Sequence, residues 1–187
     1  MQDHVEAIAY LASLLQDATT RTLTIREIKI LTQVSKDLPL LLYQLPLQLE
    51  QIHLLVDRNQ MLAMEVVPVL LMGPLAERYW DALVQHTVST NTLEVIHHCL
   101  ITRSVPVQRE LIHLTVDLAI ITCTEADYTH EEKYVRTFLK FIQSLHDHQL
   151  VDYANHVPGL QSFCIQFLHI RGVSALYKTI SNIQVQE

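Results

Sequence analysis

Histidine, aspartate and cysteine are the residues of this sequence with the capacity for chemistry, and histidine is abundant, at 11 residues. The densest group is His146-Asp147-His148, followed by Asp152 and His156. On one continuous helix, His148, Asp152 and His156 would share a face and could bind a metal ion. However, the preceding helix is expected to end near His148, which would separate the ligands, and no His-Glu-x-x-His motif is present. We therefore predict no metal site, and a metal-dependent hydrolase that uses this cluster is the least favoured of three readings of the chain.

A second pair of candidate residues, His113 and Asp117, lies four residues apart on one predicted helix. Such a pair has the form of a general base with its carboxylate. No nucleophile accompanies it, so a side-chain hydrogen bond is the simpler interpretation. Cys99, Cys123 and Cys164 each lie among apolar residues, where a thiol stays protonated and unreactive. We expect no catalytic residue, no cofactor and no enzyme activity.

The composition excludes several classes of function. The net charge is −7, and the 13 lysines and arginines are scattered singly, whereas nucleic-acid binding usually requires a basic face. The three glycines, Gly73, Gly159 and Gly172, are far apart, so no glycine-rich phosphate loop is present. The odd number of cysteines and the absence of a long apolar run predict a soluble intracellular protein. We expect it in the cytoplasm, with the nucleus as a second location, and without direct nucleic-acid or membrane partners.

Apolar residues recur at intervals of three and four through most of the chain, which predicts an all-α fold. Thr24 and Thr129 each begin a capping-box sequence that ends in glutamate, and each predicts a helix start. Short connections favour antiparallel neighbours, so we expect a compact array of about nine or ten antiparallel helices, a short stack of helical hairpins. We divide the chain into an N-terminal helix and connector, residues 1–23, and a helical domain, residues 24–187.

Individual residues refine this pattern. Asn59 is expected to cap the helix that follows it, and Pro68 predicts a kink or a break in that helix. The final helix is predicted to run continuously from Leu160 to Ile180, although Gly172 within it costs about 1 kcal/mol relative to alanine. The helix after Pro106 is predicted to bury a stripe of four apolar residues, Leu111, Leu114, Leu118 and Ile121.

The same periodicity gives a list of buried residues. Tyr79 and Trp80 are interpreted as core, whereas exposed aromatic residues there would form a partner-docking surface. In the second half of the chain the predicted core consists of Ile112, Leu114, Cys123, Phe141, Leu145, Phe163, Cys164, Phe167 and Ile170.

The last predicted helix, with Phe163-Cys164-Ile165, Phe167 and Ile170-Arg171, resembles the last long helix of one eukaryotic family. This family is the C-terminal domain of subunit eleven of the CCR-NOT mRNA deadenylase complex. Further similar segments occur in the same order between Thr24 and Ser181. They contain Asn59, Ala63 and Glu65; Glu94-Val95; Glu110 to Leu114; Thr122-Cys123; Val135-Arg136; and Phe141 to Leu145.

The resemblance implies a non-catalytic adaptor subunit that acts in mRNA deadenylation and turnover. Its implied partners are other subunits of the complex, namely subunit ten and the large NOT scaffold, together with peptide or protein adaptors. Separate nuclease subunits of that complex shorten the poly(A) tail. The alternative is a different helical scaffold of the HEAT or MIF4G kind whose resemblance to the family is accidental.

Overall fold

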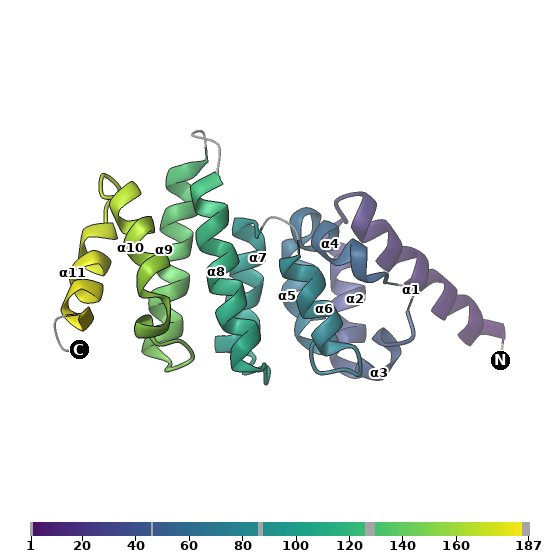
Figure 1. Cartoon of the computed structure of the whole chain (residues 1–187). Helices are drawn as coiled ribbons and strands as arrows, with labels where there is room; N and C mark the ends of the chain where they lie inside the picture. Colours follow the sequence, from purple (N-terminus) through teal and green to yellow (C-terminus); the bar gives the residue numbers. More distant parts are fainter. Residues whose placement is uncertain (1, 46, 86–87, 126–129, 185–187) are drawn as a thin grey trace. The chain divides into compact units, whose positions relative to one another are not determined.

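The computed structural model describes residues 2–45, 47–85, 88–125 and 130–184. These residues form eleven α-helices and three short helical segments and contain no β-strand, which confirms the all-α fold class (Figure 1). The chain divides into two compact units, unit 1 (Met1–His86 and His98–Pro106) and unit 2 (Thr87–His97 and Val107–Glu187). Within the described chain, no helix combines the length and the hydropathy that crossing a bilayer requires.

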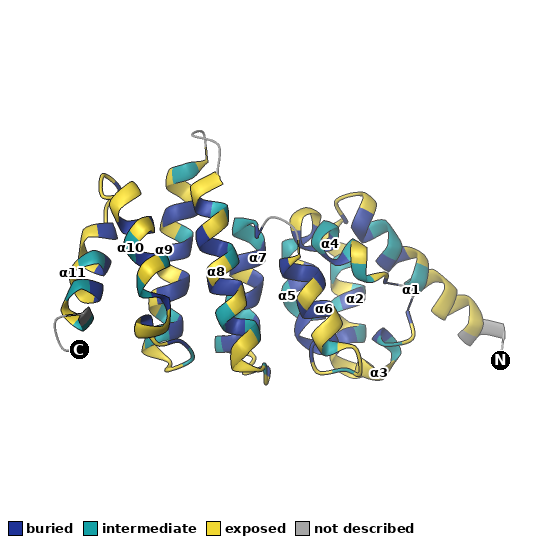
Figure 2. Cartoon of the chain, in the orientation of Figure 1, coloured by how far each residue is buried: buried dark blue, intermediate teal, exposed yellow. Residues whose placement is uncertain are grey.

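Unit 1 contains the first six α-helices, and α1 packs against α4, α2 against α5 and α4 against α6. α1, which precedes the expected helical domain of residues 24–187, belongs to unit 1 through its packing against α4. Residues 5–10 of α1 are exposed (Figure 2), whereas Leu14, Leu15 and Ala18 near its end are buried. The elements are α1 (Gln2–Thr20), α2 (Ile25–Asp37), α3 (Pro39–Leu42), a 3-10 turn (Leu49–Gln51), α4 (Ile52–Arg58), α5 (Gln60–Leu70), α6 (Ala76–Val84) and a π-helical turn (His98–Thr102).

The start of α2 confirms the capping box at Thr24. The backbone N–H of Glu27 donates to the Thr24 hydroxyl, and the Glu27 carboxylate accepts from the Thr24 backbone N–H at 2.7 Å. Arg21 forms ion pairs of 2.8 Å with both Asp17 and Glu27. The hydrogen bond from Arg21, followed by those from Thr24, lowers the pKa of Glu27 to about 2. These bonds fix the turn between α1 and α2.

Asn59 has a different role from the predicted helix cap. Its side chain makes no capping bond to α5, and Asn59 is only 4% exposed. Its Nδ2 donates to the carbonyl of Ala18 at 2.7 Å and to that of Arg21 at 2.8 Å, and its Oδ1 accepts from the backbone N–H of Leu23 at 2.8 Å. Because the last carbonyls of a helix have no intrahelical partner, Asn59 completes the hydrogen bonding at the end of α1.

Pro68 lies inside α5, which ends soon after it at Leu70. A proline cannot supply the backbone N–H that a helix interior needs, and its ring crowds the preceding turn. The chain then turns through Gly73, where an added Cβ would lie 2.4 Å from the Tyr43 ring. The helix thus includes Pro68 and ends two residues after it.

Unit 2 contains the remaining helices, with α9 packed against α7 and α8, and α10 packed against α8 and α11. The Phe163 ring lies at its centre, 5.0 Å from Phe138 in an edge-on arrangement and 5.1 Å from Phe167. The predicted capping residue Thr129 lies outside the described residues. The elements are α7 (Thr90–His97), α8 (Arg109–Glu125), α9 (Glu131–Asp147), a 3-10 turn (Tyr153–His156), α10 (Val157–Gln166) and α11 (Val173–Gln184).

The predicted orientation of α8 is wrong. Leu114 is 45% exposed and Ile121 is 50% exposed, although both were expected inside. The buried face instead carries Ile112, Thr115, Val116, Ala119, Ile120 and Cys123. Apolar residues occur on nearly every side of this helix, so its spacing fits more than one choice of buried face. The other predicted core residues of the second half are all buried.

The final helix is also different from the prediction, because it is two helices. α10 ends at Gln166, and residues 167–172 form the turn that leads into α11. Gly172 ends this turn with φ of +101°, a conformation that glycine adopts without a steric penalty. Phe167, Ile170 and Val173 are buried across the turn, so the apolar spacing continues where the helix does not.

Candidate functional site

The structure separates the histidine cluster at the end of α9. The His146 ring stacks on the Tyr153 ring with centroids 3.9 Å apart, and His148 Nδ1 lies 2.8 Å from the carbonyl oxygen of Ser144. The Asp152 side chain caps the following 3-10 turn. These side chains close the turn after α9, and no three possible metal ligands converge among the described residues.

His156, by contrast, joins the other pair of candidates. It is 4% exposed and lies between two residues of α8. Its Nδ1 is 2.8 Å from Asp117 Oδ1, and its Nε2 is 2.7 Å from His113 Nδ1. The bond predicted between His113 and Asp117 is thus replaced by a bridge through His156. Sequence spacing gave no signal for this bridge, because His156 is 39 residues from Asp117 along the chain.

The bridge uses both nitrogens of the central ring. A carboxylate can only accept, so His156 Nδ1–H donates to Asp117, and the second bond joins His156 Nε2 to His113 Nδ1, with the donor set by the tautomers of the two rings. Such a chain could relay a proton. The two hydrogen bonds of His156 join imidazole and carboxylate groups, and neither partner is a nucleophilic hydroxyl or thiol. The arrangement joins the 3-10 turn to α8 and has the form of a structural link.

The three cysteines are buried free thiols. Burial raises the pKa of Cys99 to about 12 and that of Cys164 to about 11, and it raises the pKa of Cys123 further. Since the thiolate is the reactive form, the raised pKa values predict that these thiols react slowly in the folded protein.

Tyr79 and Trp80 belong to the core of unit 1. Tyr79 is 7% exposed and Trp80 is 1% exposed, and the Tyr79 hydroxyl donates to the carbonyl of Leu47 at 3.2 Å. Burial raises the pKa of Tyr79. Because both rings are buried, they do not form the partner-docking surface that exposed aromatic residues at these positions would have provided.

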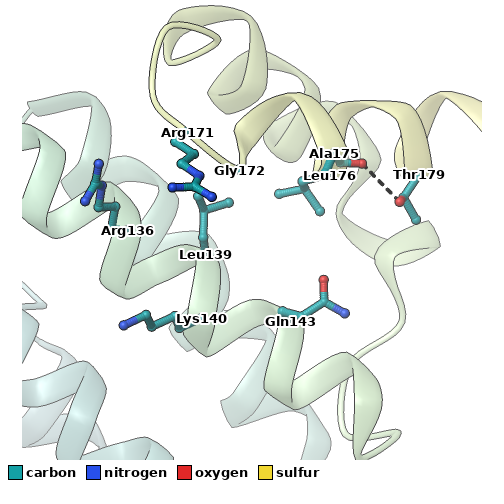
Figure 3. A pocket seen from close by; sticks show the side chains of 9 residues that line it. All are labelled: Arg136, Leu139, Lys140, Gln143, Arg171, Gly172, Ala175, Leu176 and Thr179. Atoms are coloured by element: carbon teal, nitrogen blue, oxygen red, sulfur yellow. Dashed lines mark hydrogen bonds between the residues drawn. The ribbon is translucent and has the colours of Figure 1, made fainter.

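An open pocket lies in unit 2 between α9 and the turn and helix that follow α10 (Figure 3). Its volume is about 500 Å³. Leu139 and Leu176 face each other across it, and Arg171 extends from the turn toward the end where Arg136 lies (Figure 3). The lining residues are Arg136, Leu139, Lys140 and Gln143 of α9, Arg171 and Gly172 of the turn, and Ala175, Leu176 and Thr179 of α11. The sequence analysis did not predict this site, because its residues lie in two segments about 30 residues apart.

Comparison with known proteins places the chain in a family. The sequence model of the family described as "CCR4-NOT transcription complex subunit 11" matches residues 56–181, well over half of the chain. The chain belongs to the subunit 11 family. The match confirms the suspected family, and the pocket and the Asp117–His156–His113 bridge both lie inside the matched range.

A curated relative in the subunit 11 family supports this placement. The chain is 26% identical over 145 residues to "CCR4-NOT transcription complex subunit 11" of Dictyostelium discoideum. The similarity covers 77% of the chain but 22% of the relative. The chain therefore corresponds to less than a quarter of that protein's length.

Proposed function

We propose that this chain is a non-catalytic interaction module of the CCR4-NOT deadenylase complex and acts in mRNA deadenylation and turnover. The observation that carries the proposal is the family match over residues 56–181. An ordered series of similar segments over that range argues against the accidental resemblance of an unrelated helical scaffold.

The chemistry of the described residues supports a role without catalysis. The Asp117–His156–His113 bridge lacks a nucleophile bonded to it, and the three thiols have raised pKa values. An adaptor needs surfaces and stable packing, and it does not need groups with activated pKa values. The charged and apolar lining of the pocket in unit 2 is suited to binding.

The partners we propose are subunit ten, the large NOT scaffold of the complex, and peptide or protein adaptors. A location in the cytoplasm, and also in the nucleus, fits a role in mRNA turnover. With a net charge of −7, the chain is proposed to reach mRNA through protein partners and without direct RNA contact.

Affinity purification of the tagged chain from cells, followed by mass spectrometry, tests this function. We expect subunits of the deadenylase complex to be enriched over a purification with the tag alone. The purified chain, expressed by itself in bacteria, should not shorten a poly(A) substrate. A folded chain that recovers no subunit of the complex, or that degrades poly(A) alone, would contradict the proposal.

A further inference from the structure

We propose that the pocket between α9 and α11 binds an acidic peptide segment of a partner protein. In this arrangement an aliphatic side chain of the segment contacts Leu139 and Leu176, and its carboxylates pair with Lys140 and Arg171. The proposal rests on the adaptor role, since it names the kind of partner that the module would recognise.

The charge around the pocket is the first argument. The whole chain is acidic, with a net charge of −7, yet the lining contains Arg136, Lys140 and Arg171 and no aspartate or glutamate. Arg136 already forms an ion pair with Glu132 at 2.6 Å. Among the described residues Lys140 and Arg171 form no ion pair, and both are exposed. An incoming carboxylate could therefore pair with Lys140 and Arg171 without breaking an existing ion pair of either side chain.

The apolar wall is the second argument, because it distinguishes a peptide from a free anion. Leu139, Ala175 and Leu176 supply the apolar part of the lining, and Leu139 lies next to Arg171 in Figure 3. A volume of about 500 Å³ lies within the usual range for ligand sites, roughly 300–1,000 Å³. A site with an apolar anchor and cations beside it fits an aliphatic side chain next to an acidic one. The guanidinium of Arg171 can bind a carboxylate through two parallel N–H donors.

The polar groups at the other end are held in place. Gln143 Nε2 donates to Asp147 Oδ1 at 2.9 Å, and the Thr179 hydroxyl donates to the carbonyl of Ala175 at 3.1 Å. Gly172 with its positive φ sets the turn that carries Arg171. The pocket is thus built largely on two helices, and such sites keep their geometry better than loops do.

The same lining argues against RNA as the occupant. Proteins that bind single strands usually stack bases on aromatic side chains along a basic groove. The pocket lining contains no aromatic residue. Its three cations do not continue into a basic stripe in a chain of net charge −7.

Selection from a random 12-residue peptide library displayed on phage tests the proposal with the whole 187-residue chain. The variant for counter-selection is Lys140→Glu with Arg171→Glu. The matched control is Lys133→Glu with Lys178→Glu, which changes the same charge on exposed residues of α9 and α11 that do not line the pocket. Thermal melts of all three proteins check that they are equally folded. Binding of the selected peptides is then measured by fluorescence anisotropy, with oligoadenylate as a competitor.

We expect the selected peptides to be rich in aspartate, glutamate and aliphatic residues. Loss of two charge-assisted pairs should weaken their binding by about ten-fold or more in the Lys140→Glu, Arg171→Glu variant. The control should bind them nearly as tightly as the original chain. Absence of selected peptides, peptides without acidic residues, an equal loss in the control, or displacement by oligoadenylate would each overturn the proposal. The selection uses the isolated chain, so its failure is distinguishable from failure to enter the complex.

Discussion

The side chain of Asn59 accepts a hydrogen bond from the backbone N–H of Leu23 at 2.8 Å, and both residues are buried. Asn59 begins one of the segments in which the sequence resembles its family, the one with Asn59, Ala63 and Glu65 in the order Asn-x-x-x-Ala-x-Glu. The glutamate at the end of that segment is Glu65, and its carboxylate lies 3.7 Å from a side-chain nitrogen of Lys36 and 3.7 Å from one of Arg103. Asn59 and Glu65 thus lie at two places where separate segments of unit 1 meet.

Replacing Asn59 tests the first of these places. Asn59→Ala removes the partners of the Leu23 N–H and of the carbonyls of Ala18 and Arg21. A buried polar group left without a partner costs about 1–3 kcal/mol, so we expect the free energy of unfolding to fall by at least about this amount. Urea denaturation followed by circular dichroism measures it. Asn59→Asp places a buried carboxylate oxygen against the carbonyls of Ala18 and Arg21, so it should cost at least as much as Asn59→Ala. An Asn59→Ala variant as stable as the original chain would contradict this role.

The capping box at Thr24 predicts a pH dependence. The pKa of Glu27 is lowered to about 2, mainly by Arg21, so the folded state favours the ionised carboxylate. Its stabilising effect is therefore complete above the ordinary pKa of 4.5 and is lost as the pH falls from there toward 2. An NMR titration of the Glu27 carboxyl carbon measures the pKa. In Arg21→Gln it should rise toward the ordinary value, and an unchanged titration would exclude Arg21 as its main cause.

A pair of substitutions tests the orientation of α8. Ile112 is 2% exposed, and truncating it to alanine should cost about 2–5 kcal/mol because a cavity adds to the lost burial. Leu114 is 45% exposed, so Leu114→Ala should change the stability by less than about 1 kcal/mol. Thermal or urea melts of the two variants give the comparison. A reversed order, with Leu114→Ala the more damaging, would restore the orientation predicted from sequence.

Sequence reasoning succeeded where one local rule was sufficient. The capping box at Thr24 needs only two residues three apart, and apolar periodicity is enough to assign helices. It failed in α8, because a helix with apolar residues on most sides does not specify which face is buried. It also failed at Gly172, since burial of Phe167 and Ile170 continues through a turn. The pocket in unit 2 could not be predicted from the sequence, because a pocket depends on which helices pack together.

The buried thiols predict slow chemical modification. Cys99 and Cys164 have pKa values raised by burial to about 12 and about 11, so the thiolate fraction is very small at neutral pH. We expect Ellman's reagent to react with all three cysteines in guanidinium chloride and with none rapidly in the native protein. Rapid reaction of a native thiol would show that its helix opens, or that the thiol is accessible.

The aromatic cluster of unit 2 predicts that Phe167 stabilises the fold and does not bind a partner. Phe167 is 1% exposed, and its ring lies 5.1 Å from that of Phe163. Phe167→Ala should cost about 3–5 kcal/mol, a large share of the roughly 5–15 kcal/mol that stabilises a typical domain. The melting temperature should fall markedly in calorimetry.

The control for this variant is Ile165→Ala, one of the exposed positions of α10, at 62% exposure. It should melt like the original chain. Recovery of partner subunits by affinity purification, measured below the melting temperature of each variant, separates packing from docking. If Phe167 acts only through packing, its variant recovers partners as long as it is folded. A Phe167→Ala protein that melts like the original chain but loses its partners would contradict this prediction. Phe167 would then be a docking residue, and packing against Phe163 would not be its main role.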